Sequence, residues 1–175
     1  MKIQNNYTNP AFNAKGIMVG RFDPFTNSHF KMAKTASALF DEVVILPAKP
    51  VIGELKKEFL PIETRVKLIR ECVKDYPNIK VDFYDGLTGD YARKHGINFI
   101  LRGARDKDEF QFEQALGDFN SSVNPDLTTI ILPESQNAER LSATMVRDRI
   151  AKGLDISKMV PEAIFNFIKE HYGNK

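Results

Sequence analysis

Residues 17–29 read Ile17-Met18-Val19-Gly20-Arg21-Phe22-Asp23-Pro24-Phe25-Thr26-Asn27-Ser28-His29. The apolar beginning of this run predicts a strand over residues 17–22. From Asn27 onward, apolar side chains recur at helical spacing, at Met32, Ala33, Ala36, Leu39 and Phe40. The stretch is therefore interpreted as a strand that leads straight into a helix packed on a sheet.

The same alternation of short apolar runs and helical segments continues to Thr129. The run Val43-Val44-Ile45-Leu46 suits a strand that is covered on both faces. We expect strands at residues 17–22, 42–47, 79–84, 97–101 and 127–132, and helices at 27–40, 61–76, around 91–92, and at 106–119, 142–151 and 157–172. This order predicts an α/β fold, a single doubly wound five-stranded parallel sheet of Rossmann-like type with C-terminal helices.

Composition narrows the class of protein. The chain has 175 residues, 42% of them hydrophobic and 27% charged, with a formal net charge of +2. We expect one domain over residues 16–175, preceded by a flexible polar arm over residues 1–15. Cys72 is the single cysteine, so no internal disulfide forms, and no zinc-type spacing is present. A soluble cytoplasmic protein with neither a membrane nor a nucleic-acid partner is expected.

Candidate functional residues follow the predicted strands. Open parallel sheets bind ligands beyond the carboxyl ends of their strands. His29 falls in the opening turn of the first predicted helix, where backbone N–H groups already favour an anion. Arg102 directly follows the fourth predicted strand. Taken singly, each could also be a solvated surface residue, and the residues alone leave both interpretations open.

Residues 20–29 resemble the first signature of the nucleotidyltransferase superfamily, in the form typical of the phosphopantetheine adenylyltransferase family. Ile100-Leu101-Arg102-Gly103-Ala104-Arg105 resembles the second signature, and residues 108–114 resemble the acidic and aromatic helix that follows it. Leu141-Ser142-Ala143-Thr144-Met145-Val146-Arg147 resembles the third signature. Three signatures in the family's order and spacing are a specific signal.

The resemblance implies transfer of an adenylyl group from ATP to 4′-phosphopantetheine, giving dephospho-coenzyme A and pyrophosphate. It implies catalytic roles for His29, which would hold the α-phosphate, and for Lys56 and Arg102, which would clamp the acceptor phosphate. The implied nucleotide-binding set is Arg21, Phe22, His29, Gly103, Arg105, Glu113, Ser142 and Thr144. The protein is expected to hold no metal of its own, Mg²⁺ arriving on the ATP phosphates. A homo-oligomer, a hexamer by resemblance, is also implied.

Departures from the family pattern keep other functions open. Arg21 replaces Thr or Ser, Ser28 replaces Gly in the first signature, and Ala143 interrupts the hydroxyl series of the third. Lys56 lies in a charged run that could be a solvated loop. The alternatives are an adenylyltransferase for another phosphorylated acceptor, such as nicotinamide mononucleotide, and a non-catalytic nucleotide-binding relative. A Rossmann-type oxidoreductase is disfavoured, because no Gly-x-Gly-x-x-Gly turn follows the first strand.

Overall fold

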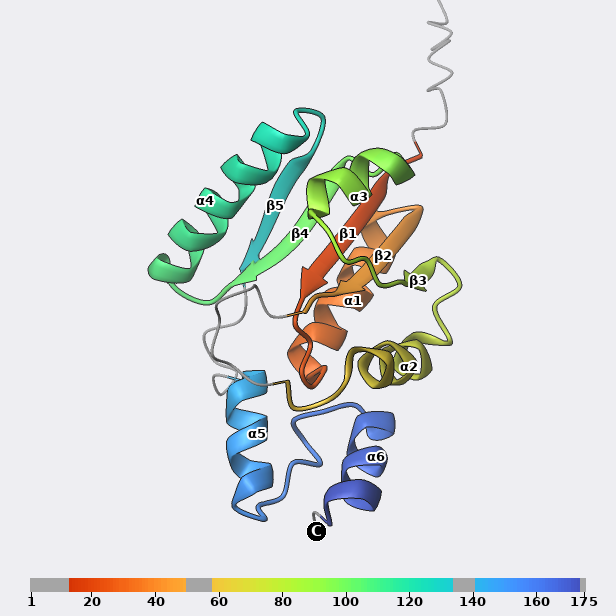
Figure 1. The fold of residues 1–175 in the computed structure, drawn as a ribbon, viewed down its shortest axis with the longest axis vertical. Coiled ribbons are helices and arrows are strands. Elements are labelled where there is room, and N and C mark those ends of the chain that lie inside the picture. The colour runs from red at the N-terminus through yellow and green to blue at the C-terminus, as the bar shows by residue number, and fades with distance from the viewer. Residues whose placement is uncertain (1–12, 50–57, 134–140, 174–175) are drawn as a thin grey trace, which may run out of the picture.

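The structure is a computed structural model that describes residues 13–49, 58–133 and 141–173. A five-stranded sheet with the order β3-β2-β1-β4-β5 forms its centre, and the paired strands are parallel throughout (Figure 1). The elements are β1 (Lys15–Gly20), α1 (Asn27–Leu39), β2 (Glu42–Pro47), α2 (Ile62–Val73), β3 (Ile79–Val81), α3 (Thr88–His95), β4 (Phe99–Ala104), α4 (Lys107–Val123), β5 (Thr128–Pro133), α5 (Ala143–Ala151) and α6 (Glu162–Tyr172). The predicted fold class is confirmed.

Helices cover both faces of the sheet. Alternate strand residues face opposite sides, so that Met18 packs with one buried cluster and Ile17 with the other. The first cluster includes Ala33 of α1 and Ile69 of α2, whereas the second includes Tyr91 of α3. Figure 1 shows α5 and α6 beyond the end of the sheet, with α6 next to α2. The carboxyl ends of the strands therefore open toward these last two helices.

Helix ends follow the expected chemistry. Thr26 caps α1, and Asp106 and Ser142 cap α4 and α5 with their side-chain oxygens. Gly96 ends α3 with φ of 62°, a left-handed conformation that glycine adopts without strain. The predicted helix stop at Gly96 is confirmed.

Several predicted boundaries were wrong. Strand β1 begins at Lys15, which pairs with Glu42, and Ala14 already donates its N–H to the carboxylate of Asp41 at 2.8 Å. Residues 1–12 of the expected arm lie outside the described residues. Strand β1 also ends at Gly20 rather than residue 22, because the chain turns sharply at Phe22, whose φ is 47°.

The predicted ends of β3, β4, α4 and α6 also need correction. Strand β3 stops at Val81, not residue 84. Strand β4 continues to Ala104 because β5 pairs along it, with Arg102 opposite Ile131, so Arg102 lies within the strand. Helix α4 continues to Val123. Helix α6 starts at Glu162 rather than residue 157, because Pro161 is extended, with ψ of 154°, and a proline also disfavours the helical conformation of the residue before it. In the described part of the chain, no helix is long and apolar enough to cross a membrane.

Candidate active site

Two cavities meet at the carboxyl-terminal edge of the sheet, and both are lined by Val19, Arg102 and Glu113. The first has a volume of about 310 Å³ and is built from the ends of β1 and β4, the start of α1 and the first half of α4. Its functional side chains are those of Phe22, His29, Arg102, Arg105, Glu109 and Glu113. This first cavity brings the first and second sequence signatures together.

His29 is oriented by the end of its own helix. Its Nδ1 accepts the backbone N–H of Thr26 at 3.0 Å, while the Thr26 hydroxyl accepts the backbone N–H of His29 at 3.4 Å. This reciprocal arrangement is a capping box, with a histidine in the position that Glu or Gln commonly takes. Because Nδ1 accepts this hydrogen bond, it is the unprotonated ring nitrogen, and the neutral ring carries its proton on Nε2. His29 can thus act as a hydrogen-bond donor through Nε2.

The surroundings keep His29 neutral. Burial, followed by the positive charges of Arg105 and Arg102, lowers the pKa of His29 from 6.5 to about 4. At neutral pH the ring is therefore a dipolar donor, whereas the two guanidiniums supply the positive charge. The combination suits an anion that gains charge during a reaction.

Arg102 is held in place by two partners. Its Nε and Nη2 donate to the carboxylate of Glu113 at 2.5 and 2.6 Å, and Nη1 donates to the carbonyl of Val19. Glu113 is 8% exposed, so this is a largely buried, bidentate ion pair. The guanidinium has five N–H donors, of which these contacts engage three. Glu113 thus orients Arg102, while the nucleotide contact that the resemblance implied for Glu113 stays a prediction.

Arg105 forms a second ion pair on the rim of the first cavity. Its backbone N–H and Nε donate to Glu109 at 3.0 and 2.9 Å, and this pairing lowers the pKa of Glu109. Glu109 lies in the first turn of α4, whose N-terminus also favours negative charge. The rim therefore carries two arginine–glutamate pairs, in which Arg102 lies in β4, Arg105 directly follows β4, and both glutamates lie on α4.

The second cavity has a volume of about 550 Å³ and lies between the sheet edge, α3 and α4. Many of its walls are apolar, contributed by Tyr84, Leu87, Ile100 and Leu116. Lys49 lies at its edge, where Nζ is 3.1 Å from the carboxylate of Asp85. A ligand with a long, weakly polar arm and an anionic end at Arg102 would fit these walls.

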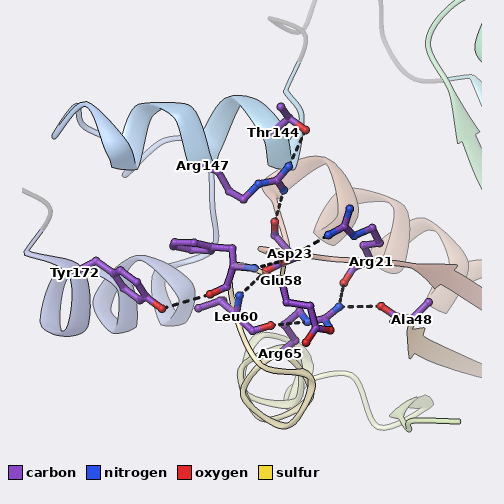
Figure 2. A network of polar contacts seen from close by, with 10 residues as sticks. Arg21, Asp23, Ala48, Glu58, Leu60, Arg65, Thr144, Arg147 and Tyr172 are labelled. Atoms are coloured by element: carbon purple, nitrogen blue, oxygen red, sulfur yellow. Dashed lines mark hydrogen bonds and ion pairs between the residues drawn. The ribbon is translucent and has the colours of Figure 1, made fainter. Parts of the chain in front are cut away.

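A buried carboxylate anchors the turn that precedes α1. Asp23 is 0% exposed, and its carboxylate accepts the backbone N–H groups of Phe59 and Leu60 at 2.8 and 2.9 Å. Its own carbonyl accepts Nη1 of Arg147 at 2.6 Å (Figure 2). The turn is therefore tied both to the segment before α2 and to α5.

Arg65 of α2 is the buried cation next to this turn. It is 1% exposed and donates to the carbonyls of Leu60, Arg21 and Ala48 at 3.0, 2.5 and 2.9 Å, and to the carboxylate of Glu58 (Figure 2). We did not predict a function for this residue. The signal was present, since a charged residue three positions after Ile62 lies on the apolar face of the helix and must find partners there.

The predicted site residues fall into three groups. His29, Arg102, Gly103, Arg105, Phe22 and Glu113 line the first cavity. Arg21, Ser142 and Thr144 are not among its lining residues. Arg21 extends toward Asp23, with Nη2 4.0 Å from that carboxylate, while the Ser142 hydroxyl accepts the Met145 N–H and Thr144 Oγ1 accepts Nη2 of Arg147. Lys56 lies outside the described residues.

The described ranges contain no group of three or more His, Cys, Asp or Glu side chains that could hold a metal ion. The acidic residues of the rim are each engaged by an arginine. A divalent cation arriving with a polyphosphate would thus meet side chains that are already paired.

Known proteins resemble the chain in both sequence and fold. The model of the cytidylyltransferase-like family matches residues 17–149. Phosphopantetheine adenylyltransferase of Flavobacterium psychrophilum is 38% identical over 150 residues, covering 86% of this chain and 97% of that protein. The enzyme of the same name from Shouchella clausii is 34% identical over 158 residues, covering 90% of this chain and 98% of that protein. A Vibrio parahaemolyticus crystal structure, provisionally assigned as a nicotinate-nucleotide adenylyltransferase, shares the fold with a TM-score of 0.69 and 18% identity, covering 91% of this chain and 94% of that one.

The parallel sheet, the two cavities at its carboxyl edge and the match over residues 17–149 define a cytidylyltransferase-like nucleotidyltransferase. The two phosphopantetheine adenylyltransferases are more than 30% identical to this chain over nearly their whole length, which identifies one family within this class. The chain belongs to the phosphopantetheine adenylyltransferase family.

Proposed function

We propose that the protein transfers the adenylyl group of MgATP to 4′-phosphopantetheine, forming dephospho-coenzyme A and pyrophosphate. The observation that carries this proposal is that Arg102 lines both cavities, with His29 in the first of them. Transfer between two phosphate-bearing substrates requires two adjacent binding sites, and a cation where the sites meet would offset the repulsion between the two phosphates. The family relationship supports the identity of both substrates.

In the proposed reaction, an oxygen of the acceptor phosphate attacks the α-phosphorus of ATP. One P–O bond forms, the bond between the α-phosphorus and the bridging oxygen breaks, and pyrophosphate carries away the electron pair. No covalent intermediate with the protein is required. Catalysis then consists of aligning the two phosphates and stabilising the charge that develops on the α-phosphoryl oxygens. His29 Nε2–H and the guanidiniums of Arg102 and Arg105 supply that stabilisation.

We assign the nucleotide to the first cavity and the acceptor to the second. The first contains His29 and Arg105, whereas the second has the apolar walls that a pantetheine arm needs. Arg102 between them would contact the acceptor phosphate. Lys56 keeps its proposed role as a clamp on the same phosphate.

Mg²⁺ belongs to the substrate in this proposal. Mg²⁺ retains most of its water ligands and is commonly held by substrate phosphates with one or two carboxylates at most. The paired state of Glu109 and Glu113 fits a cation that arrives already bound to ATP. It would offset part of the negative charge of the departing pyrophosphate.

Pyrophosphate release with MgATP and a panel of acceptors tests the proposal. We expect turnover with 4′-phosphopantetheine, and at least 100-fold lower kcat/KM with nicotinamide mononucleotide and with dephosphorylated pantetheine. A preference for the mononucleotide would assign a different acceptor. ATP binding without turnover on any acceptor would identify a non-catalytic relative.

Self-association is part of the proposal. Phe110, Phe112 and Phe119 of α4 are 45%, 62% and 54% exposed, and α4 lies beside the edge strand β5. Exposed aromatic side chains concentrated on one helix are typical of a surface that binds another protein. Phe112 and Phe119 also line the first and second cavities, so we expect a second copy of the chain to cover Phe110 and to border the two cavities. Light scattering on the purified protein would measure this self-association. The hexamer and the cytoplasmic location stay predictions.

A further inference from the structure

Phe22 occupies a strained position between β1 and α1. Its φ of 47° lies in the left-handed region, which destabilises a residue with a Cβ by about 1 kcal/mol or more. Its ring lies edge-on to the imidazole of His29, with centroids 5.0 Å apart and an interplanar angle of 79°. The conformation of Phe22 therefore determines one wall against which His29 packs.

Arginines from distant helices bind the carbonyl groups of the residues before and after Phe22. Arg65 Nη1 donates to the Arg21 carbonyl at 2.5 Å, and Arg147 Nη1 donates to the Asp23 carbonyl at 2.6 Å. Figure 2 shows Arg147 approaching the turn from α5 and Arg65 approaching it from α2 on the other side. Left-handed residues persist where the surrounding structure fixes the chain on both sides of them, and these two contacts fix the chain at Arg21 and at Asp23.

We propose that Arg65 and Arg147 are positioning residues for the reaction, which hold the strained Phe22 turn and thereby fix the imidazole of His29 at the α-phosphate. The inference rests on the proposed function, because His29 matters only if it meets that phosphate. Neither arginine lines the first cavity, so both act through the turn. Reacting groups that move by about 1 Å lose on the order of 100-fold in rate, so loss of either contact has a measurable effect.

Arg147 has a second contact that the experiment must separate from the first. Its Nη2 donates to Thr144 Oγ1 at 2.9 Å, which leaves the hydroxyl proton of Thr144 to point elsewhere. A change at Arg147 therefore disturbs both the turn and Thr144. The Thr144→Ala variant disturbs only the second of these, and Arg149 of the same helix donates to the carbonyl of Asp155 at 3.0 Å, away from the turn.

The test compares Arg147→Met with Arg149→Met and Thr144→Ala by proton NMR of the histidine rings, without substrate. The chain has three histidines, and the signals of His29 are assigned by their loss in His29→Gln. The ring current of Phe22 shifts the carbon-bound protons of His29. We expect these signals to move in Arg147→Met and to stay in place in Arg149→Met and Thr144→Ala, and kcat of Arg147→Met to fall about 10- to 100-fold.

Arg65→Lys provides a second, independent variant. A lysine keeps the buried positive charge beside Asp23 and Glu58 but loses the fork that reaches several carbonyls. In Arg65→Lys we expect the same His29 signals to move and kcat to fall. Circular dichroism should show that this variant remains folded. Unchanged His29 signals in both Arg147→Met and Arg65→Lys would overturn the inference, whatever the rates. Absence of turnover in the wild-type protein would instead overturn the proposed function. The NMR comparison would still show whether Arg65 and Arg147 determine the position of the His29 ring.

Discussion

Arg102 and Glu113 form a two-pronged ion pair at the point where the two cavities meet, with Arg102 Nη2 2.6 Å from Glu113 Oε1. The pair joins the end of β4 to the middle of α4. The carboxylate of Glu113 restricts the guanidinium to one orientation. The Arg102 side chain therefore loses less conformational entropy when it binds a phosphate.

Glu113→Gln keeps the size of the side chain and removes its charge. We expect Arg102 to lose its fixed orientation, so that kcat/KM for the acceptor falls about 10- to 100-fold. In Arg102→Ala we expect kcat/KM for the acceptor to fall further. The double variant should resemble Arg102→Ala, because Glu113 acts through Arg102. Arg70→Ala is the matched control, since Arg70 donates only to the Val81 carbonyl in its described contacts. Fully additive losses in the double variant would show that Glu113 has a separate role.

His29→Ala removes the Nε2 donor from the first cavity. Loss of one donor that stabilises developing charge lowers kcat by about 100-fold or more. Steady-state kinetics should show this loss with a circular dichroism spectrum like that of the wild type. A kcat equal to that of the wild type would remove His29 from the mechanism.

The lowered pKa of His29 makes a prediction about stability and pH. The unfolded chain protonates this residue near pH 6.5, whereas the folded protein keeps it neutral down to about pH 4. The contribution of His29 to stability is therefore complete above pH 6.5, declines as the pH falls and is lost below pH 4. Urea unfolding should show that the free energy of unfolding falls more between pH 7.5 and pH 5 in the wild type than in His29→Gln. A His29 NMR titration midpoint near 6.5 would contradict the account.

Asp23→Ala tests the anchor of the turn before α1. The change leaves the N–H groups of Phe59 and Leu60 without their buried acceptor and leaves Arg65 with Glu58 but without the charge of Asp23. We expect the free energy of unfolding to fall by about 2–4 kcal/mol. Asp41→Ala is the control, because Asp41 also accepts a backbone N–H but at an exposed site, and it should change stability by less than about 1 kcal/mol. Equal losses from the two variants, measured by urea unfolding, would argue against the anchor.

Leu116→Ala tests the assignment of the acceptor to the second cavity. Loss of apolar wall area should raise KM for 4′-phosphopantetheine about threefold to tenfold and leave KM for ATP within twofold, since Leu116 lines the second cavity and not the first. Leu39→Ala, at an exposed position on α1, should change neither constant. A selective rise in KM for ATP would reverse the assignment of the two cavities.

The sequence predicted the strand order along the chain and most element ends, because continuous apolar runs and Gly or Pro at the boundaries are local signals. The family signatures also selected His29, Arg102 and Arg105, which the structure brings together in the first cavity, although their roles stay predictions. It did not predict that Glu113 binds Arg102, nor that β4 continues past Leu101. Both depend on pairing with segments distant in the chain, which local patterns do not encode.

Arg65 and Arg147 were missed for a related reason. Arg65 joins α2 to the turn after β1, and Arg147 contacts Asp23 across 124 residues of sequence. A charged residue on an apolar helix face signals a buried partner but does not identify it. The departures at Arg21 and Ser28 have no explanation in the described contacts beyond the approach of Arg21 to Asp23.

The products formed from MgATP and 4′-phosphopantetheine test the central claim most directly. Mass spectrometry of the nucleotide products, together with phosphorus NMR, would quantify dephospho-coenzyme A and pyrophosphate in one reaction. The account predicts equal amounts of the two products with wild-type protein, and at least 100-fold slower formation of both with His29→Ala. Pyrophosphate without an adenylylated acceptor, or no product at all, would contradict it.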